Sequence, residues 1–276
     1  MENCFGIAMQ ENLHVTFIQS HLHWENITAN LAMFEEKIAF LPQRTDIIIL
    51  PEMFSTGFTM NASQLAEFMN QNTCKWLQKQ AEKMQAVMVA SAIIKENSRF
   101  YNRLLWVEPS GSIDFYDKRH LFSFAGEDKV FTAGTKRIIK TWKGWHICPL
   151  ICYDLRFPIW SRNVNLAYDL LIYVANWPNP RLRAWDILLQ ARAIENQTYC
   201  IGVNRAGVDG NGLPYNGNSA AYDFKGETLA KAENGEEKAV QIVLEKNTLQ
   251  EYRQKFTAYL DADAFEIVET RDRSLG

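Results

Sequence analysis

The chain has little excess charge, no long apolar run and few cysteines. Its 29 basic and 32 acidic residues leave a net charge of −3 without a clustered basic stripe, so the charge does not favour a nucleic-acid partner. No apolar run approaches the roughly 18 residues that a membrane span needs, so we expect no membrane attachment. The start, MENCFGIAMQENLHVTF, lacks a basic region followed by a continuous apolar core, which predicts no signal peptide.

Cysteine is scarce, and its pattern argues against both disulfides and metal. The five residues are odd in number and scattered, namely Cys4, Cys74, Cys148, Cys152 and Cys200. Scattered thiols of this kind predict a reduced, cytoplasmic protein. Cys148 and Cys152 have no second Cys/His pair to complete a zinc site, and a redox pair needs the tighter Cys-x-x-Cys spacing. We therefore expect no metal.

Strand-like and helix-like segments alternate along the 276 residues, of which 47% are hydrophobic. Strands are predicted at LHVTFIQ, DIIILPE, VMVASAII, HICPLIC, DLLIYVAN, TYCIGVNR and around SAAYDF and KAVQIVL, with a hairpin at RLLWVEPSGSIDFYDK. Helices are predicted over residues 26–41, 64–85, 159–167, 181–196 and 249–259, and a Gly/Asn-rich loop over 207–218. No linker or repeat interrupts the pattern, which predicts an α/β layered domain with helices covering the sheets.

Glu52 and Lys118 end predicted strands, where α/β proteins gather their active residues. Glu52 follows the apolar run IIILP. The nearby Phe54, Phe58 and Met60 would exclude water from its carboxylate. A desolvated glutamate has a raised pKa and can act as a base near neutral pH, while a solvated glutamate that opens a loop is the alternative. Lys118 ends the second strand of the hairpin, where a surface lysine is the alternative.

Cys152 ends the strand HICPLIC and is either a buried structural cysteine or a nucleophile. A reactive thiol needs a cation or a base beside it. The five histidines form no recognisable Cys/His protease context, and His146, on the same strand, would lie far from the thiol. If Cys152 is a nucleophile, a glutamate can serve as its base and a lysine ammonium can stabilise the oxyanion.

Four segments occur in an order that resembles one known family: LPEMFSTGF, YDKRHLF, ICYDLRFP and ARAIENQTY. The chain resembles the nitrilase superfamily of carbon–nitrogen hydrolases, from about residue 13 to the 240s. One such motif alone would be weak evidence, but all four in order are specific. CYDLRFP, VANWP and RAIENQ are most similar to the omega-amidase branch, whose members hydrolyse the side-chain amide of alpha-keto acids such as alpha-ketoglutaramate and alpha-ketosuccinamate.

The resemblance implies a fold, an assembly and a mechanism. The fold would be a four-layer α-β-β-α sandwich formed by residues 1–276 as one domain, with the C-terminal tail at the interface of a homodimer. Cys152 would be the nucleophile and Glu52 the general base, then the acid that protonates the leaving ammonia. Lys118 would hold the oxyanion together with the backbone N–H of Tyr153. The resemblance implies no metal or organic cofactor.

The resemblance also implies a second glutamate between the lysine and cysteine motifs, which would orient Lys118 and help to position the substrate. Glu127, in FAGEDKVF, is the candidate, with the adjacent Asp128 as the alternative. Arg156 would bind the carboxylate of the substrate, because a planar guanidinium suits that group. A surface arginine, or a salt bridge with Asp154, is the alternative reading of Arg156.

Asn176 and Trp177, at the end of DLLIYVAN, would line the substrate pocket, although Trp177 would also suit plain core packing. Asp154 and Glu195 would brace the structure, as charges next to active residues often do.

Two other functions stay open. A different carbon–nitrogen hydrolase would act on a nitrile, an N-carbamoyl amino acid or an aliphatic amide, because the motifs barely constrain the acyl group. Arg156 argues for an anionic substrate. A non-catalytic binding protein on the same fold is expected to have lost Glu52, Lys118 or Cys152, and all three are present.

Overall fold

Two six-stranded sheets form the centre of the computed structural model, which describes residues 12–41 and 44–268. The first sheet has the order β14 (Lys238–Leu244), β1 (Leu13–Gln19), β2 (Ile47–Ile49), β3 (Val87–Glu96), β4 (Arg99–Val107) and β5 (Ile113–Asp117). The second has the order β13 (Thr228–Lys231), β12 (Ala220–Tyr222), β9 (Tyr199–Asn204), β8 (Leu170–Ala175), β7 (Trp145–Ile151) and β6 (Lys140–Trp142). Neighbours β1, β2 and β3 are parallel, as are β7, β8 and β9.

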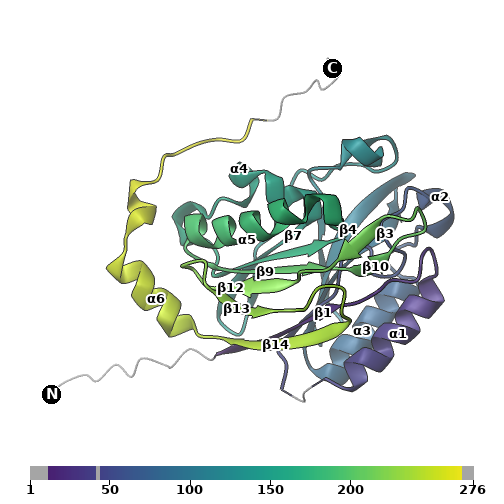
Figure 1. Ribbon diagram of the computed structural model, residues 1–276, viewed down its shortest axis with the longest axis horizontal. Coiled ribbons are helices and arrows are strands. Elements are labelled where there is room, and N and C mark those ends of the chain that lie inside the picture. The colour runs from purple at the N-terminus through teal and green to yellow at the C-terminus, as the bar shows by residue number, and fades with distance from the viewer. Residues whose placement is uncertain (1–11, 42–43, 269–276) are drawn as a thin grey trace.

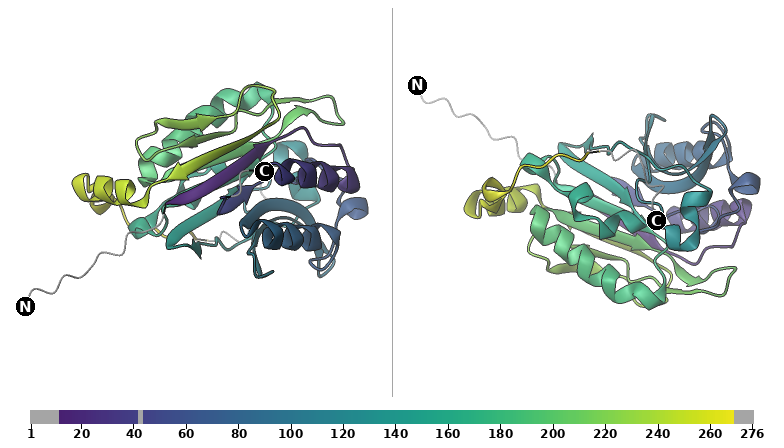
Figure 2. Two further views of the ribbon diagram at one scale, coloured as in Figure 1. Left: turned by 90° about the horizontal axis from the view of Figure 1, so that it is seen from below. Right: turned by 90° about the horizontal axis from the view of Figure 1, so that it is seen from above.

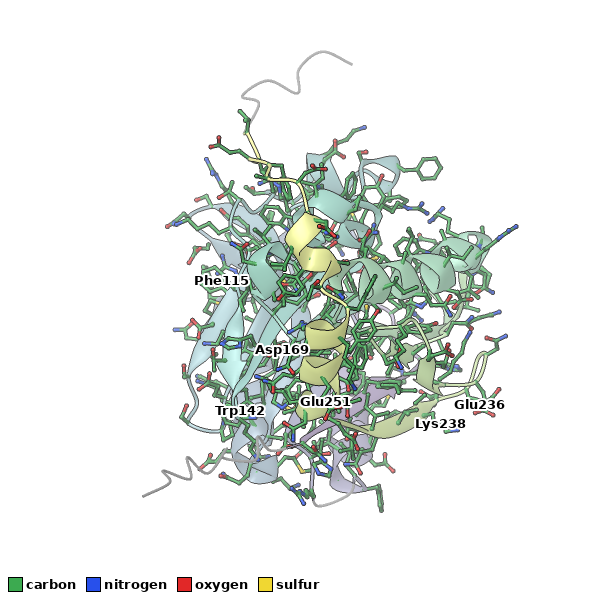
Figure 3. The ribbon with its side chains drawn as sticks, turned by 90° about the vertical axis from the view of Figure 1, so that its left-hand side faces the viewer. Phe115, Trp142, Asp169, Glu236, Lys238 and Glu251 are labelled. Atoms are coloured by element: carbon green, nitrogen blue, oxygen red, sulfur yellow. The ribbon has the colours of Figure 1, made fainter. Side chains whose placement is uncertain are left out.

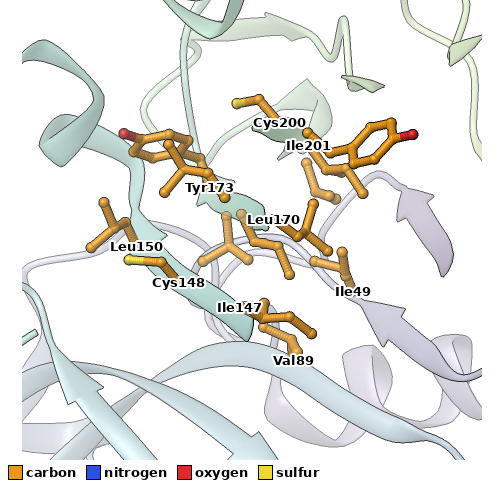
Figure 4. Close-up of a cluster of buried hydrophobic side chains, with 14 of the residues drawn as sticks. Ile49, Val89, Ile147, Cys148, Leu150, Leu170, Tyr173, Cys200 and Ile201 are labelled. Atoms are coloured by element: carbon orange, nitrogen blue, oxygen red, sulfur yellow. The ribbon is translucent and has the colours of Figure 1, made fainter. Parts of the chain in front are cut away.

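The strands at the centre are apolar on both faces because both faces are covered. In β2, Ile49 packs toward the second sheet, in one core with Val89 and Ile147, whereas Ile48 packs toward the helices. Figure 4 shows Ile49 and Val89 from the first sheet beside Ile147 and Leu170 from the second. Alternate residues of one strand therefore serve two different cores, which is why the run DIIIL lacks polar positions.

Helices close the outer faces of both sheets (Figures 1 and 2). On the first sheet lie α1 (Ile27–Ala39) and α3 (Asn72–Met84), whose residues Phe34 and Leu77 pack against Ile48. On the second lies α5 (Leu182–Asn196). It packs closely on β9 at Gly202, where the Cβ of any other residue would clash with Leu189. The layers run α-β-β-α, which confirms the predicted four-layer sandwich.

Short elements fill the connections. Two of them are the helices α2 (Ala62–Leu65) and α4 (Pro158–Ser161), and two are the paired strands β10 (Ala206–Val208) and β11 (Pro214–Asn216). The others are the 3₁₀ turns η1 (Ser123–Ala125), η2 (Glu127–Lys129), η3 (Cys152–Arg156), η4 (Val164–Leu166) and η5 (Asn179–Arg181). The helix α6 (Lys246–Lys255) and the 3₁₀ turn η6 (Ala258–Asp261) follow the last strand, β14. The predicted loop over 207–218 thus contains part of a hairpin. Among the helices of the described residues, none has the length and apolar content that a membrane crossing requires.

The predicted helix over residues 64–85 is wrong, because two helices occupy that region. After α2 the chain turns extended, and Glu67 pairs with Ile94 at the end of β3. The Glu67 carboxylate then accepts the backbone N–H groups of Asn72 and Thr73 at 3.1 and 3.2 Å, which caps α3. Because Glu67 bridges to β3 and caps α3, the chain forms two helices here, although its apolar residues recur at helical spacing.

The predicted helix over residues 159–167 is also wrong. The helical conformation ends after α4, and beyond it the side chain of Asn163 forms hydrogen bonds with the backbone. Its amide binds both the N–H and the carbonyl of Tyr168, at 3.0 and 2.9 Å, and closes a short loop that contains only η4. Asparagine side chains compete with helix in this way.

A buried ion network fixes α6 against the second sheet. Asp169, just before β8, accepts from Arg253 Nη1 at 2.8 Å, from Lys246 Nζ at 3.0 Å and from the His146 N–H at 3.0 Å. Figure 3 views this side of the molecule, with Asp169 beside α6. Burial disfavours the charge, but the His146 amide and the Lys246 ammonium lower the pKa of Asp169.

Replacing Asp169 with asparagine is expected to lower the free energy of unfolding by about 3 kcal/mol, because two buried cations lose their counter-charge. The folded pKa of Asp169 is depressed, so its stabilisation is present above the unfolded pKa of about 3.9 and is lost as pH falls through the folded value. Urea unfolding across acidic pH measures this dependence. The control is Asp114→Asn, which breaks a more exposed ion pair with Lys140 and should cost below about 1 kcal/mol. Equal losses in both variants would contradict the assignment.

Candidate active site

Cys152 stands where β7 ends and η3 begins, at the carboxyl edge of the second sheet. Its φ of +42° lies in the left-handed region, which is strained for a residue with a side chain and is often found at functional sites. The sharp turn leaves Sγ 4.0 Å from the carbonyl oxygen of Asn176, at the end of the neighbouring strand β8. Cys152 as a whole is 8% exposed, and it lines a cavity.

Glu52 follows β2 in the first sheet and is completely buried. Its Oε1 accepts from Lys118 Nζ and from Asn102 Nδ2, each at 2.8 Å, and its Oε2 accepts from the Asn176 N–H at 2.8 Å. The alternative of a solvated glutamate is therefore wrong. Because Asn176 contacts both Glu52 and Cys152, it links the ends of the two sheets.

Lys118, directly after β5, is also buried rather than on the surface. Besides Glu52, its Nζ binds both oxygens of Glu127 at 3.1 and 2.9 Å and lies 5.2 Å from the centre of the Phe58 ring. Burial opposes the charge of Lys118, but the carboxylates of Glu127 and Glu52 raise its pKa above the usual value. The ammonium therefore stays charged over the physiological range.

Glu127, rather than Asp128, is the second carboxylate at this site. Glu127 is fully buried in η2 and accepts the Phe122 N–H at 2.6 Å, whereas Asp128 is exposed. Burial raises the pKa of Glu127, Lys118 opposes the rise, and Glu52 adds to it. Lys118 thus bridges two buried carboxylates, and the low dielectric of the interior strengthens both ion pairs.

Asn102 is a site residue that the sequence analysis missed. It lies on β4, and its Nδ2 donates to Glu52 at 2.8 Å and to Glu127 at 3.1 Å, while its Oδ1 accepts from Ser91 Oγ at 3.0 Å. These bonds hold the two carboxylates on either side of Lys118. The available signal was a polar residue within the buried run NRLLW, which needs a hydrogen-bond partner inside the protein.

A cavity of about 570 Å³ opens beside Cys152, and the residues predicted for substrate binding all line it. Those residues are Tyr153, Arg156, Asn176 and Trp177. Trp177 also packs on Trp185 with ring centres 5.6 Å apart, so it serves both the cavity and the core. The described residues contain no group of three or more His, Cys, Asp or Glu side chains that could hold a metal ion.

Arg156 does not pair with Asp154. The Asp154 carboxylate instead accepts from the Tyr116 hydroxyl at 2.7 Å, from the His120 ring at 2.8 Å and from the Ile151 N–H at 3.1 Å. Asp154 is therefore the brace that the sequence predicted, and it fixes the turn that carries Cys152. The other predicted brace, Glu195, forms an ion pair with Arg192 at 2.9 Å.

Burial, and next the Glu52 carboxylate, raises the pKa of the Cys152 thiol well above its usual value, although Lys118 acts in the opposite direction. The resting thiol is consequently neutral at neutral pH. A neutral thiol could act as a nucleophile only with a base that removes its proton, and Glu52 lies close enough to interact with the sulfur.

The raised pKa of the Cys152 thiol predicts how the ultraviolet absorbance of its thiolate depends on pH. At neutral pH the wild type and the Cys152→Ala variant are expected to show the same thiolate absorbance, because a thiol with a raised pKa stays protonated. The difference between them should emerge only in alkali. The measurement is a pH titration of the difference spectrum in the absence of substrate. A thiolate signal that titrates below neutral pH would instead indicate a preformed ion pair with Lys118.

Comparison with known proteins assigns the class that the sandwich and the site suggest. A family model described as Carbon-nitrogen hydrolase matches residues 14–254. Omega-amidase YafV of Escherichia coli is 46% identical over 257 residues, which cover 92% of this chain and 98% of that protein. The 2-oxoglutaramate amidase of Bacillus subtilis is 32% identical over 230 residues, which cover 82% of this chain and 88% of that protein.

A solved structure supports the same assignment. XC1258 from Xanthomonas campestris, a CN-hydrolase superfamily protein with an arsenic adduct in its active site, has a TM-score of 0.91 and 38% sequence identity. The alignment covers 94% of this chain and 100% of that one. The chain belongs to the carbon–nitrogen hydrolase family of the nitrilase superfamily, as its four motifs predicted.

Proposed function

We propose that the enzyme hydrolyses the terminal amide of an alpha-keto dicarboxylic acid monoamide, such as alpha-ketoglutaramate or alpha-ketosuccinamate, and releases ammonia. The observation that carries the proposal is the buried Glu52–Lys118 pair beside Cys152, in a cavity that also contains Arg156. The identity to an omega-amidase and to a 2-oxoglutaramate amidase supports this substrate class.

In the first step Cys152 attacks the amide carbon while Glu52 takes the thiol proton. A neutral thiol needs this coupled transfer, since its pKa is raised by burial. The negative charge that develops on the amide oxygen is stabilised by Lys118 and by the N–H of Tyr153. That N–H lies in the first turn of η3, where backbone donors lack partners within the helix.

In the second step the tetrahedral intermediate collapses, and Glu52 returns the proton to the leaving nitrogen as ammonia departs. The acyl group then remains on Cys152 as a thioester. Glu52, again a carboxylate, accepts a proton from water as the water oxygen attacks the thioester carbon. The C–S bond then breaks, Glu52 returns the proton to the sulfur of Cys152, and the keto dicarboxylate leaves. Glu127 and Asn102 hold Glu52 and Lys118 in position throughout.

Arg156 is the residue that binds the carboxylate of the substrate. Its guanidinium lies 4.9 Å from the centre of the Trp177 ring, and both residues line the cavity. Stacking on an aromatic ring fixes the plane of the guanidinium and leaves its N–H groups available for a carboxylate.

The experiment that tests the substrate class is ammonia release from a panel of amides. We expect alpha-ketoglutaramate and alpha-ketosuccinamate to be turned over with a kcat/KM at least about tenfold above that of glutamine, asparagine, an N-carbamoyl amino acid, a neutral aliphatic amide or a nitrile. Preferred turnover of a neutral amide or a nitrile would point to a different carbon–nitrogen hydrolase. No turnover of any of them would favour a non-catalytic protein.

We also propose that the chain is one domain over residues 1–276 and works as a cytoplasmic homodimer. Support comes from exposed apolar side chains on and after α4, on α5 and in the C-terminal tail, namely Ile159, Val164, Ile187, Ile194, Phe265 and Ile267. Such a surface suits an interface with a second copy. A monomer in sedimentation velocity at micromolar concentration would refute the dimer.

A further inference from the structure

Two guanidinium groups, not one, line the cavity beside Cys152. Arg156 comes from η3, and Arg181 ends η5 just before α5. Trp177 connects them, because its ring lies under Arg156 and its Nε1 donates to the carbonyl of Arg181 at 2.8 Å. The two arginines therefore approach the cavity from neighbouring parts of its wall.

The guanidinium groups of both arginines contact aromatic rings. Within residues 12–41 and 44–268, Arg156 and Arg181 form no ion pair and no side-chain hydrogen bond, only contacts with aromatic rings. The carboxylate of Asp209, which also lines the cavity, is engaged by its own loop: it accepts the Leu213 N–H at 3.0 Å and the Tyr215 hydroxyl at 3.0 Å.

Glu25, the other acidic residue of the cavity wall, is engaged in the same way. It accepts from the Thr59 hydroxyl at 2.5 Å and from Asn61 Nδ2 at 3.3 Å. Among the described residues that line the cavity, Arg156 and Arg181 thus have no counter-ion, whereas both carboxylates already accept hydrogen bonds. This arrangement favours an anionic ligand at the arginines.

Aromatic rings orient Arg181 relative to the catalytic lysine. Its guanidinium carbon lies 5.0 Å from the centre of the Phe122 ring and 5.9 Å from that of Phe124. The backbone N–H of Phe122 donates to Glu127, which in turn binds Lys118. Within the described part of the chain, the ring contacts therefore place Arg181 beside Phe122 without any direct contact to the network that positions Lys118.

We propose that Arg181 is a second substrate-binding residue that determines specificity: together with Arg156 it holds the alpha-keto acid head of the amide substrate and rejects the corresponding alpha-amino acid. This inference rests on the proposed function. A planar alpha-keto carboxylate presents three acceptor oxygens, more than one bidentate guanidinium can bind. An amino acid places an ammonium at the position of the keto oxygen, where a guanidinium repels it.

The test is a comparison of Arg181→Met with Arg183→Met. Arg183 lies two residues further along, on α5, is exposed and does not line the cavity, so its replacement removes the same charge without touching the site. Arg181→Met is expected to raise KM for alpha-ketoglutaramate roughly 10- to 100-fold, the loss typical of a charged hydrogen bond. We expect kcat to stay close to wild type, and hydrolysis of a neutral aliphatic amide to be unchanged. Arg183→Met should behave as wild type in every assay.

Specificity gives a second readout. The ratio of kcat/KM for alpha-ketoglutaramate to that for glutamine should fall in Arg181→Met, because the repulsive cation has been removed. An unchanged KM and ratio would overturn the proposal. An equal loss on keto acid amides and neutral amides would overturn it too, since that pattern indicates a structural role for Arg181.

Direct binding separates this inference from the proposed function. In the Cys152→Ala background, calorimetry measures the affinity for 2-oxoglutarate, a keto dicarboxylate that the enzyme cannot process further. Weaker binding in Cys152→Ala/Arg181→Met supports the two-arginine site even if the wild type fails to hydrolyse keto acid amides, a failure that would refute only the proposed function. Equal binding in both variants, or none in either, overturns the role of Arg181.

Discussion

Replacing Cys152 with alanine is expected to abolish ammonia release, with a loss of kcat on the order of 10⁵ or more, because no other group can take the nucleophile's place. The fold should persist. The turn at Cys152 is fixed by Asp154, whose carboxylate binds the N–H of Ile151 and two side chains from other elements, and none of these bonds involves the sulfur. Steady-state ammonia release and circular dichroism together measure both parts of the prediction.

The matched control is Cys148→Ala. Cys148 lies on the same strand, β7, is fully buried and does not line the cavity. Its loss removes one sulfur from the core and is expected to cost roughly 1–2 kcal/mol of stability without changing kcat. Substantial turnover by Cys152→Ala, or a loss of kcat in Cys148→Ala that matches it, would contradict the assignment of the nucleophile.

Replacing Lys118 with methionine is expected to damage both activity and stability. The variant loses the cation that we propose stabilises the oxyanion, and the loss of such a donor typically costs a factor on the order of 10²–10³ in kcat. It also leaves the buried carboxylates of Glu52 and Glu127 without their shared counter-ion. Breaking a buried ion pair from one side typically costs about 3–5 kcal/mol of stability.

The sign of the pH dependence follows from the same geometry. With Lys118 gone, burial and the nearby Glu52 raise the folded pKa of Glu127 above the unfolded value, because both already raise the pKa of Glu127 in the wild type. The variant is therefore most stable in acid, and it loses stability as pH rises through the folded pKa. Urea unfolding of wild type and Lys118→Met across pH measures the difference.

Lys129→Met provides the control for Lys118→Met. Lys129 is exposed in the same loop region, at the end of η2, so its replacement removes a charge without uncovering a carboxylate. It is expected to leave both kcat and the free energy of unfolding close to wild type. Should Lys118→Met prove as stable as Lys129→Met and retain a similar kcat, the bridging role of Lys118 would be refuted.

Sequence patterns predicted the strands that carry the site because each is a short apolar run with a polar residue at its end. Glu52, Lys118 and Cys152 follow β2, β5 and the buried β7 in this way. The four layers came from the resemblance and not from periodicity, since an apolar strand does not reveal which of its two faces meets another sheet. The structure shows that Ile48 and Ile49 face different cores, a fact that only tertiary packing decides.

The features that sequence reasoning missed depend on long-range partners. Asn102 binds Glu52 and Glu127, which lie 50 and 25 positions away in the chain. Arg181 begins a predicted helix, where an arginine is normally a solvated residue, and its free guanidinium matters only because the helix starts at the rim of the cavity. The false helix over residues 64–85 arose likewise, because the pairing of Glu67 with β3 is not visible in local periodicity.

The proposed mechanism requires a thioester on Cys152 during turnover. Mass spectrometry of the enzyme quenched with acid during turnover of alpha-ketoglutaramate, followed by peptide mapping, detects this intermediate directly. We expect an added mass equal to the acyl group, located on the peptide that contains Cys152 and absent from the Cys152→Ala variant. Ammonia release with Cys152 unmodified at every quench time, or an acyl group on Cys148 or Cys200 instead, would contradict it.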